Sequence, residues 1–362
     1  MAPAKKIWRV LYTIILPIAF VSVFFIYSKN NTSLSIKAED PKEEFVIEKQ
    51  RGAHVFGLHD STDFQEFKGQ NIEWITMVPW GFQKNELSSE VSHGSVDSLR
   101  ATRHDHEWAK RIKMVRSKGF KVFLKPHLWI HEPSLGKWRS DIFPSSEEDW
   151  KMWSDSYSDY IVRYAKVAEE GSAEMYCIGT EFSRLTLEKP EYWIELIANV
   201  RKVYSGKVVY AANWYKEYEE IGFWDQLDFI GIQAYFPLSK SEYPGVEELS
   251  QSWNEFVPAL STVSEKYDRK ILFTEMGYRS TSTGAIEPWL WVEDPALGEE
   301  IYSGVTQANC YQAFFNSIWD QEWFAGLHLW QMRPDIEQRR NKELDFTPQG
   351  KPASDVIRKG YE

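Results

Sequence analysis

Cysteine is scarce in this chain, because only Cys177 and Cys310 occur among its 362 residues. A disulfide scaffold is therefore excluded, and neither a Cys-x-x-Cys pair nor the Cys/His spacing of a zinc site is present. Both cysteines lie in apolar segments, so we interpret them as small buried hydrophobic residues. The sequence alone does not decide whether these two cysteines form a disulfide with each other.

Positive charge is also in short supply. Lys and Arg number 42 against 53 Asp and Glu, which gives a formal net charge of -11. Nucleic-acid binding relies on clusters of Lys and Arg, so nucleic acid is not an expected partner. The hydrophobic share of 43% and charged share of 26% exclude disordered and fibrous classes. The 17 Trp residues either build an aromatic core or stack on ligands.

Charge is absent from residues 10–28, which are apolar and follow a short basic stretch. This run is long enough to span a bilayer, and its basic flank predicts a cytoplasmic N-terminus. We expect residues 1–28 to be a retained membrane anchor, 29–52 a polar stem, and 53–362 a folded domain on the exported side, periplasmic or at the cell surface. A cleaved signal peptide and a secreted protein are the alternative.

Eight short apolar runs alternate with helix-length amphipathic segments after residue 52. The runs span residues 53–60, 72–80, 120–130, 173–182, 207–214, 228–237, 270–278 and 326–332. Continuous apolar runs indicate parallel strands that are buried on both faces. The order predicts an α/β fold, a (β/α)8 TIM barrel preceded by the transmembrane helix. A doubly wound sheet is disfavoured because no glycine-rich phosphate turn follows the first run.

One intervening helix has clear ends. Ser145 and Glu148 form a capping-box pattern, a run of aromatic and aliphatic residues follows at helical spacing, and Gly171 marks the end.

The residues at the carboxyl ends of the strands matter most, because active sites of such barrels lie there. The strand ends carry Asp60, Trp80, Lys125, His127, Glu181, Asn213, Trp214, Tyr235, Glu275 and Trp330. Any one Lys, Asn or Trp among them could simply satisfy loop backbone. The two glutamates differ, because burying a carboxylate at the end of a strand destabilises the fold unless the carboxylate is paired with another group. An unpaired one indicates a functional role.

Glu181 and Glu275 fall on the fourth and seventh predicted strands, so they should face each other across the mouth of the barrel. Glycoside cleavage requires two such carboxyl groups, one protonated and one ionised. Mutual repulsion and burial would separate their pKa values. Tyr235, on the adjacent sixth strand, could hydrogen-bond Glu275 and hold its orientation.

Five blocks in the chain resemble glycoside hydrolase family 113. They are VFLKPHLWI, YCIGTEFSRL, RKVYSGKVVYAANW, FWDQLDFIGIQAYFPL and ILFTEMGYRS, and the likeness extends over roughly residues 53–335. The resemblance implies a clan A barrel and retaining endo-β-1,4-mannanase activity, with Glu181 as acid/base and Glu275 as nucleophile. Oligo- or polysaccharide would be the partner. Gln233 stands where the family pattern leads us to expect an acidic residue, and Gln331 with Met332 where it leads us to expect a more basic and aromatic pair. These departures could change the preferred glycan.

The remaining strand-end residues are the candidates for substrate binding: Lys125, His127, Asn213, Trp214, Tyr235, Trp330 and Trp80. No cofactor and no metal are expected. A metal-dependent hydrolase would use residues 104–107, or His127 with His131 and Glu132, but the first cluster reads as the solvated face of a helix. A barrel that binds carbohydrate without catalysis is a further alternative, although a binder has no need of two buried acids.

Overall fold

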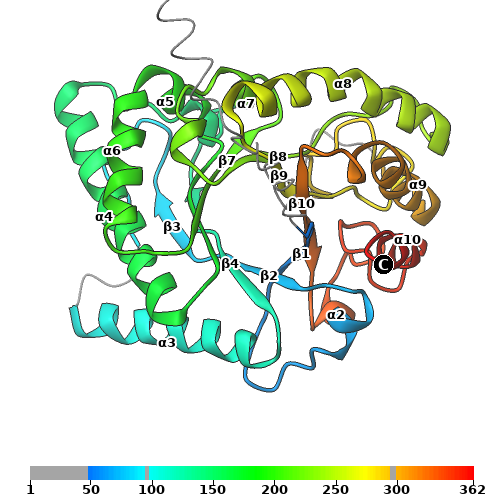
Figure 1. Ribbon diagram of the computed structural model, residues 1–362, viewed down its shortest axis with the longest axis horizontal. Helices are drawn as coiled ribbons and strands as arrows, with labels where there is room; N and C mark the ends of the chain where they lie inside the picture. The colour runs from blue at the N-terminus through cyan, green and yellow to red at the C-terminus, as the bar shows by residue number, and fades with distance from the viewer. Residues whose placement is uncertain (1–47, 94–97, 294–298) are drawn as a thin grey trace, which may run out of the picture. The chain divides into compact units, whose positions relative to one another are not determined.

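Eight parallel strands close into a barrel, and helices surround it (Figure 1). The computed structural model describes residues 48–362 except 94–97 and 294–298. The barrel strands are β1 (Gln50–Val55), β2 (Trp74–Met77), β4 (Lys121–Leu124), β6 (Met175–Thr180), β7 (Lys207–Asn213), β8 (Phe229–Gln233), β9 (Ile271–Met276) and β10 (Phe324–Met332). Their order around the barrel is β1-β10-β9-β8-β7-β6-β4-β2, so the predicted (β/α)8 architecture is confirmed.

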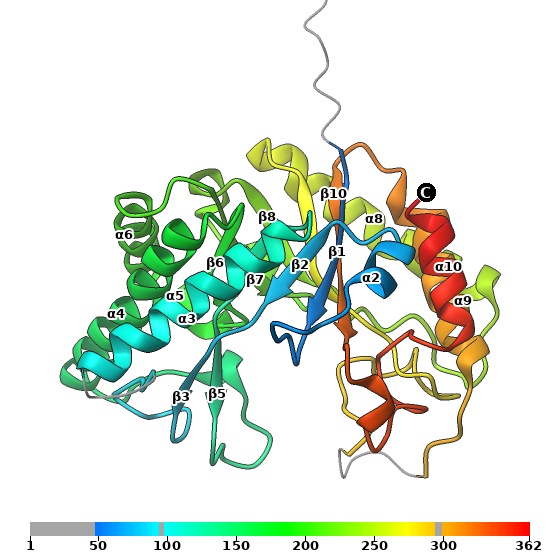
Figure 2. The ribbon, with the colours of Figure 1, turned by 90° about the horizontal axis from the view of Figure 1, so that it is seen from below.

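The expected runs 72–80 and 120–130 are not single strands. Each is interrupted by a proline, Pro79 or Pro126. Trp80, the last residue of the first run, begins β3 (Trp80–Gln83), and the second half of the other run forms β5 (His127–Ile130). Proline has no N–H to donate to a ladder, which explains the breaks. β3 and β5 pair in parallel as a separate sheet at the carboxyl ends of β2 and β4 (Figure 2).

Helices and helical turns fill the connections between strands. The α-helices are α2 (Gln65–Gly69), α3 (Ser98–Ser117), α4 (Glu147–Gly171), α5 (Ser183–Glu188), α6 (Pro190–Arg201), α7 (Glu217–Glu220), α8 (Val246–Tyr267), α9 (Gly304–Phe314) and α10 (Pro352–Gly360). Shorter turns are η1 (Arg139–Asp141), η2 (Trp224–Gln226), η3 (Phe315–Trp319) and η4 (Ile336–Gln338).

Helix α4 begins one residue later than predicted. Its N-cap is Ser146, whose hydroxyl accepts a hydrogen bond from the Asp149 N–H at 3.1 Å, so the capping box expected from Ser145 and Glu148 is wrong. The helix ends at Gly171, as predicted. Its buried face packs on the barrel with Trp153, Tyr157, Tyr160, Ile161, Tyr164 and Val167.

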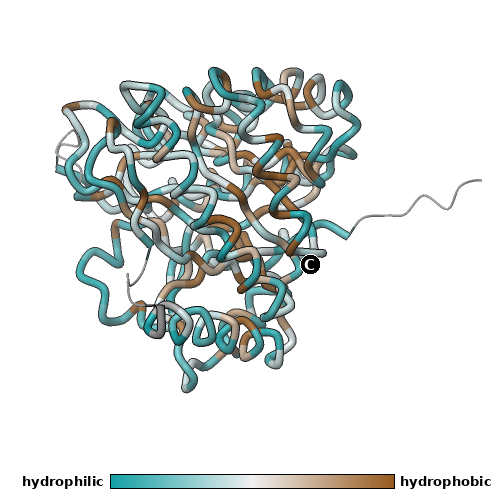
Figure 3. The backbone as a smooth tube through the Cα atoms, turned by 90° about the vertical axis from the view of Figure 1, so that its left-hand side faces the viewer, coloured by the Kyte–Doolittle hydropathy of each residue, from teal (hydrophilic) through white to brown (hydrophobic). Residues whose placement is uncertain are grey.

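Apolar side chains pack on both faces of the strands, inside the barrel and between the barrel and the helices. The barrel interior is filled by Trp74, Phe123, Met175, Cys177, Val209, Ala211, Phe229, Leu272 and Ala325, and a larger cluster includes strand residues together with residues of the surrounding helices. Figure 3 shows the hydrophobic segments concentrated inside and the hydrophilic ones on outer turns. Cys177 and Cys310 are both buried free thiols, so the disulfide left open by the sequence is not formed. Apolar side chains fill most of the interior, apart from His328, which is hydrogen-bonded to Thr76 and Gln50.

The expected membrane helix, residues 10–28, lies outside the described residues. Among the helices that the structure does describe, none is both long and apolar enough to cross a bilayer.

Candidate active site

Glu275 lies in β9 at the carboxyl end of the barrel and is 3% exposed. Its Oε2 accepts a hydrogen bond from the Tyr235 hydroxyl at 2.9 Å, so the contact expected between these residues is present. Its Oε1 accepts a hydrogen bond from the Lys125 ammonium, with which it forms a buried ion pair. Two imidazoles complete the surroundings, with Nε2 of His127 at 3.2 Å and Nε2 of His54 at 3.5 Å from Oε1.

The groups around Glu275 stabilise its ionised form. Burial alone would raise the pKa of Glu275, but the charge of Lys125 and the imidazole of His127 hold that pKa well below its usual range. Burial lowers the pKa of His127 to about 3 and that of His54 well below its usual range, so both rings are neutral at pH 7. Lys125 is therefore the positive charge that balances the carboxylate at this point.

Gln233 accounts for the position of Lys125. Its side-chain oxygen accepts hydrogen bonds from the Lys125 ammonium at 2.8 Å and from the Thr274 hydroxyl at 3.0 Å. The family pattern led us to expect an acidic residue at this position. Because an amide is neutral, Lys125 directs its charge to one carboxylate, Glu275, instead of sharing it between two.

We predict that Lys125→Met moves the acidic limb of the kcat/KM profile to higher pH. Removing a cation in contact with Glu275 raises the pKa of this carboxyl group, because its ionised form loses the neighbouring positive charge. Glu275 must then be deprotonated at a higher pH before it can act. Lys121→Met is the matched control, because Lys121 is exposed at the opposite end of the same strand. An unmoved limb in Lys125→Met would show that Lys125 does not set this ionisation.

Glu181 follows the last residue of β6 and has a φ of 58°, in the left-handed region. A non-glycine residue there is strained and needs support from its surroundings. The Glu181 N–H donates to Ala211 O at 2.9 Å, and the next N–H, that of Phe182, donates to the Tyr210 hydroxyl at 2.7 Å. The strained turn projects the carboxyl group beyond the strand.

Three donors approach the Glu181 carboxyl group. Oε2 accepts from Arg139 Nη2 at 2.9 Å and from the indole N–H of Trp138 at 3.3 Å, and Oε1 lies 3.5 Å from the Asn213 amide nitrogen. Arg139 is 7% exposed, so this ion pair is shielded from water. Asn213, predicted from the end of its strand, thus lies beside the first glutamate.

The predicted tryptophans form part of a larger aromatic wall. Trp330 is 5% exposed; its ring packs edge-on against His54, at 5.0 Å between centroids, and lies parallel to His127 at 6.2 Å. Trp80 is half-buried and packs edge-on against His127 at 5.2 Å. Trp214 stacks on the more exposed Trp289 at 5.5 Å. These flat apolar faces suit packing against sugar C–H groups.

Sequence reasoning missed several residues of the site, chiefly His54, Trp138 and Arg139. His54 was counted within a strand expected to continue to residue 60, whereas β1 ends at Val55. Trp138 and Arg139 belong to the loop after β5, outside every predicted strand end. The large number of tryptophans was the one signal that pointed to a wider aromatic surface.

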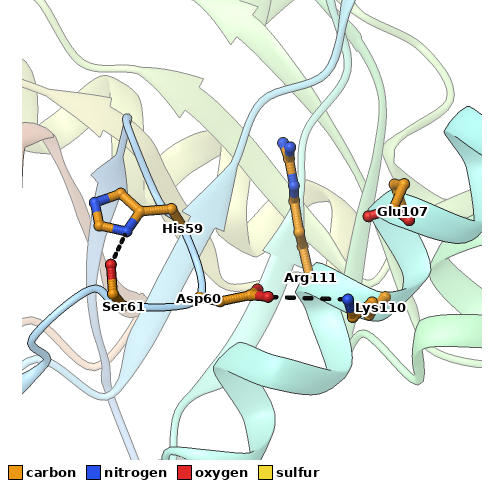
Figure 4. Close-up of a pocket in the computed structure, with 6 residues that line it drawn as sticks. All are labelled: His59, Asp60, Ser61, Glu107, Lys110 and Arg111. Carbon is orange, nitrogen blue, oxygen red and sulfur yellow. Dashed lines mark hydrogen bonds and ion pairs between the residues drawn. The ribbon is translucent and has the colours of Figure 1, made fainter.

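Asp60 does not belong to this site, so its assignment to a strand end was wrong. It is exposed and lies 3.9 Å from Lys110 of α3. His59, Asp60, Ser61, Glu107, Lys110 and Arg111 line a shallow hollow on the outer surface (Figure 4). The hollow contains neither candidate glutamate. Nearby, His106 pairs with Glu170 at 3.0 Å, and no three His, Cys, Asp or Glu side chains of the described residues are grouped as metal ligands.

Comparisons with known proteins agree with this geometry. The sequence model of Glycoside Hydrolase Family 113 matches residues 45–351. A solved complex of a β-1,4-mannanase of that family is 28% identical, covers 87% of this chain and 99% of its own, and has a TM-score of 0.71. The β-mannanase of Alicyclobacillus acidocaldarius, solved in complex with ManMIm, is 27% identical. It covers 88% of this chain and 98% of its own, and has a TM-score of 0.71.

A more distant likeness concerns the fold alone. The β-glucuronidase of Ruminococcus gnavus is 16% identical, with a TM-score of 0.55, and the match covers 87% of this chain but 50% of that one. No curated protein sequence matches the chain.

Proposed function

Because the chain belongs to glycoside hydrolase family 113 and is a glycoside hydrolase, we propose that it cleaves β-1,4-linked mannan or glucomannan with retention of anomeric configuration. The observation that carries the proposal is the contrast between the surroundings of Glu275 and those of Glu181. Glu275 is held ionised by Lys125 and oriented by Tyr235. Glu181 sits on a turn after the fourth barrel strand, with hydrogen-bond donors around it.

In the first step, Glu275 attacks the anomeric carbon while Glu181 gives its proton to the departing glycosidic oxygen. The Arg139 guanidinium donates a hydrogen bond to Oε2 of Glu181. It therefore stabilises the Glu181 carboxylate that remains after the proton has been transferred. Tyr235 holds the attacking carboxylate in place.

In the second step, Glu181 takes a proton from water, which attacks the anomeric carbon and releases Glu275. The returning carboxylate regains its ion pair with Lys125, and this favours its departure from the sugar. The substrate would lie against the tryptophans that surround the two glutamates, of which Trp289 and Trp291 are each 39% exposed.

The substrate preference is inferred from the two mannanases, which are similar to this chain. We expect purified protein to release reducing ends from mannan and glucomannan and not from cellulose, xylan or chitosan. Release from one of the other three alone would keep the glycosidase chemistry and assign another β-glycan. The buried departures Gln233, Gln331 and Met332 would then be the first positions to examine.

We also propose that the enzyme is anchored in a membrane by residues 10–28, with the catalytic domain on the exported side. The support is the uncharged sequence of that run and its basic flank. The protein should fractionate with membranes and resist extraction by alkaline carbonate, and protease added from the exported side should digest the barrel. A mature N-terminus shortly after Ser28 would instead establish a cleaved signal peptide.

A further inference from the structure

Another buried glutamate, Glu217, is hydrogen-bonded to residues that neighbour the proposed acid/base. Glu217 is the first residue of α7, follows β7 and is 1% exposed. Its Oε1 accepts hydrogen bonds from the Tyr210 hydroxyl at 2.6 Å and the Thr186 hydroxyl at 3.0 Å. Its Oε2 accepts from the Asn213 backbone N–H at 2.7 Å and the Ser183 hydroxyl at 2.9 Å. The mechanism above assigns no step to this carboxyl group.

The donors to Glu217 come from the two segments that form the acid/base site. Ser183 and Thr186 belong to α5, which starts two residues after Glu181. Asn213 ends β7, and its side-chain amide approaches Glu181. One carboxyl group therefore joins the turn that carries Glu181 to the strand end that carries its neighbour.

Tyr210 adds a second connection between these segments. Its hydroxyl donates to Glu217 and accepts from the Phe182 N–H at 2.7 Å. Phe182 is the residue next to Glu181, whose own backbone is in the left-handed region. A strained turn persists only where its surroundings determine it, and here Glu217 and Tyr210 supply hydrogen bonds that do so.

Retaining a carboxyl group at this position has a cost. Burial raises the pKa of Glu217 to about 7, although the bonds from Tyr210 and Asn213 act in the opposite direction. A folded-state pKa above the ordinary value of 4.5 means that the folded protein holds a proton that the unfolded chain releases. Stability therefore falls as the pH rises between about 4.5 and 7. A residue whose ionisation is unfavourable for folding needs another reason to be there.

We propose that Glu217 is a positioning residue for acid/base catalysis, which fixes the turn of Glu181 and the end of β7 in one arrangement so that the acid points at the glycosidic oxygen. This inference rests on the role given to Glu181 in the proposed function. Glu217 itself does not touch the substrate. Its effect reaches the reaction through the Glu181 turn and through Asn213.

The test replaces Glu217 with Gln and compares substrates that differ in their need for an acid. An amide presents an NH2 group where the carboxylate accepted hydrogen bonds, so one of the Glu217 donors loses its acceptor. We expect kcat on mannan to fall roughly 10- to 100-fold, the scale of a small misplacement of a catalytic group. Formation of the glycosyl-enzyme from an aryl mannoside with a good leaving group should change less than about 3-fold, because that step needs little help from an acid.

Asp228→Asn is the matched control. The Asp228 carboxylate accepts a hydrogen bond from the Val208 N–H at 2.8 Å, near the opposite end of β7, and is partly buried. This variant removes a comparable carboxylate contact to the same strand, and the ratio of the two activities should stay that of the unaltered enzyme.

A milder variant covers the case in which Glu217→Gln does not fold. Thr186→Val preserves the shape of the side chain and removes one donor, so it should reduce mannan cleavage selectively and to a smaller extent. Equal losses on mannan and on the aryl mannoside, in Glu217→Gln or in Thr186→Val, would overturn the inference. Glu181→Ala, measured in parallel, separates the two failures: if that variant shows no selectivity either, the proposed role of Glu181 is at fault.

Discussion

Replacing Glu275 with Gln is expected to lower kcat on every glycan substrate by about 10⁴-fold or more while the barrel stays folded. An amide cannot form the glycosyl ester, and loss of a catalytic nucleophile has effects of this order or larger in other enzymes. Gln retains the size of the side chain and an oxygen that can accept from Tyr235. Steady-state assays with mannan and with an aryl mannoside should show the same collapse, because both substrates need the nucleophile.

Stability measurements complete the test of Glu275. The variant leaves Lys125 buried without its carboxylate partner, and breaking a buried ion pair on one side is destabilising. We expect an unchanged far-UV circular dichroism spectrum but a lower Tm. Adding Lys125→Met should recover part of the Tm without any activity. Activity of Glu275→Gln within about 10-fold of the unaltered enzyme would remove Glu275 from the nucleophile's role, since such a loss is far below that scale.

The stereochemical outcome gives an independent check on the unaltered enzyme. Proton NMR during hydrolysis should show the β-anomer as the first product, because two successive displacements at one carbon restore its configuration. The α-anomer as first product would exclude a glycosyl-enzyme on Glu275.

The barrel could be predicted from the sequence, because few folds other than one with buried parallel strands are compatible with continuous apolar runs at regular intervals. The sequence was also sufficient to pair Tyr235 with Glu275, since neighbouring strands place their ends side by side. The prolines at 79 and 126 were visible, yet nothing local showed that the residues after them would pair with each other as β3 and β5. That pairing depends on how β2 and β4 come together in three dimensions.

The electrostatics of the site were less accessible from the sequence. Lys125 was expected to bind substrate, but it is fully buried against Glu275 and Gln233. Arg139 lies in a loop whose sequence carries no strand signal, and its contact with Glu181 depends on how that loop folds back. Whether a charged residue faces the ligand or a neighbouring charge is decided by packing, which periodicity does not report.

Glu181→Ala is expected to separate the two halves of the reaction. Cleavage of mannan should fall by about 10² to 10⁴-fold, the usual contribution of a general acid, because the departing sugar oxygen needs its proton. An aryl mannoside with a good leaving group should still form the glycosyl-enzyme at nearly the original rate. Pre-steady-state release of the aryl group would show this as a burst, followed by slow turnover.

Azide distinguishes an absent acid/base from general damage. Without Glu181, water lacks a base, whereas azide attacks the glycosyl-enzyme without one and should restore turnover of the aryl substrate. The product should be the β-mannosyl azide, formed with retention. Asn213→Ala is the comparison variant, because it removes one contact to Glu181 and leaves the carboxyl group in place. Azide should not accelerate the reaction of Asn213→Ala. If Glu181→Ala instead loses activity equally on mannan and on the aryl mannoside, and azide does not restore it, the acid/base is another residue.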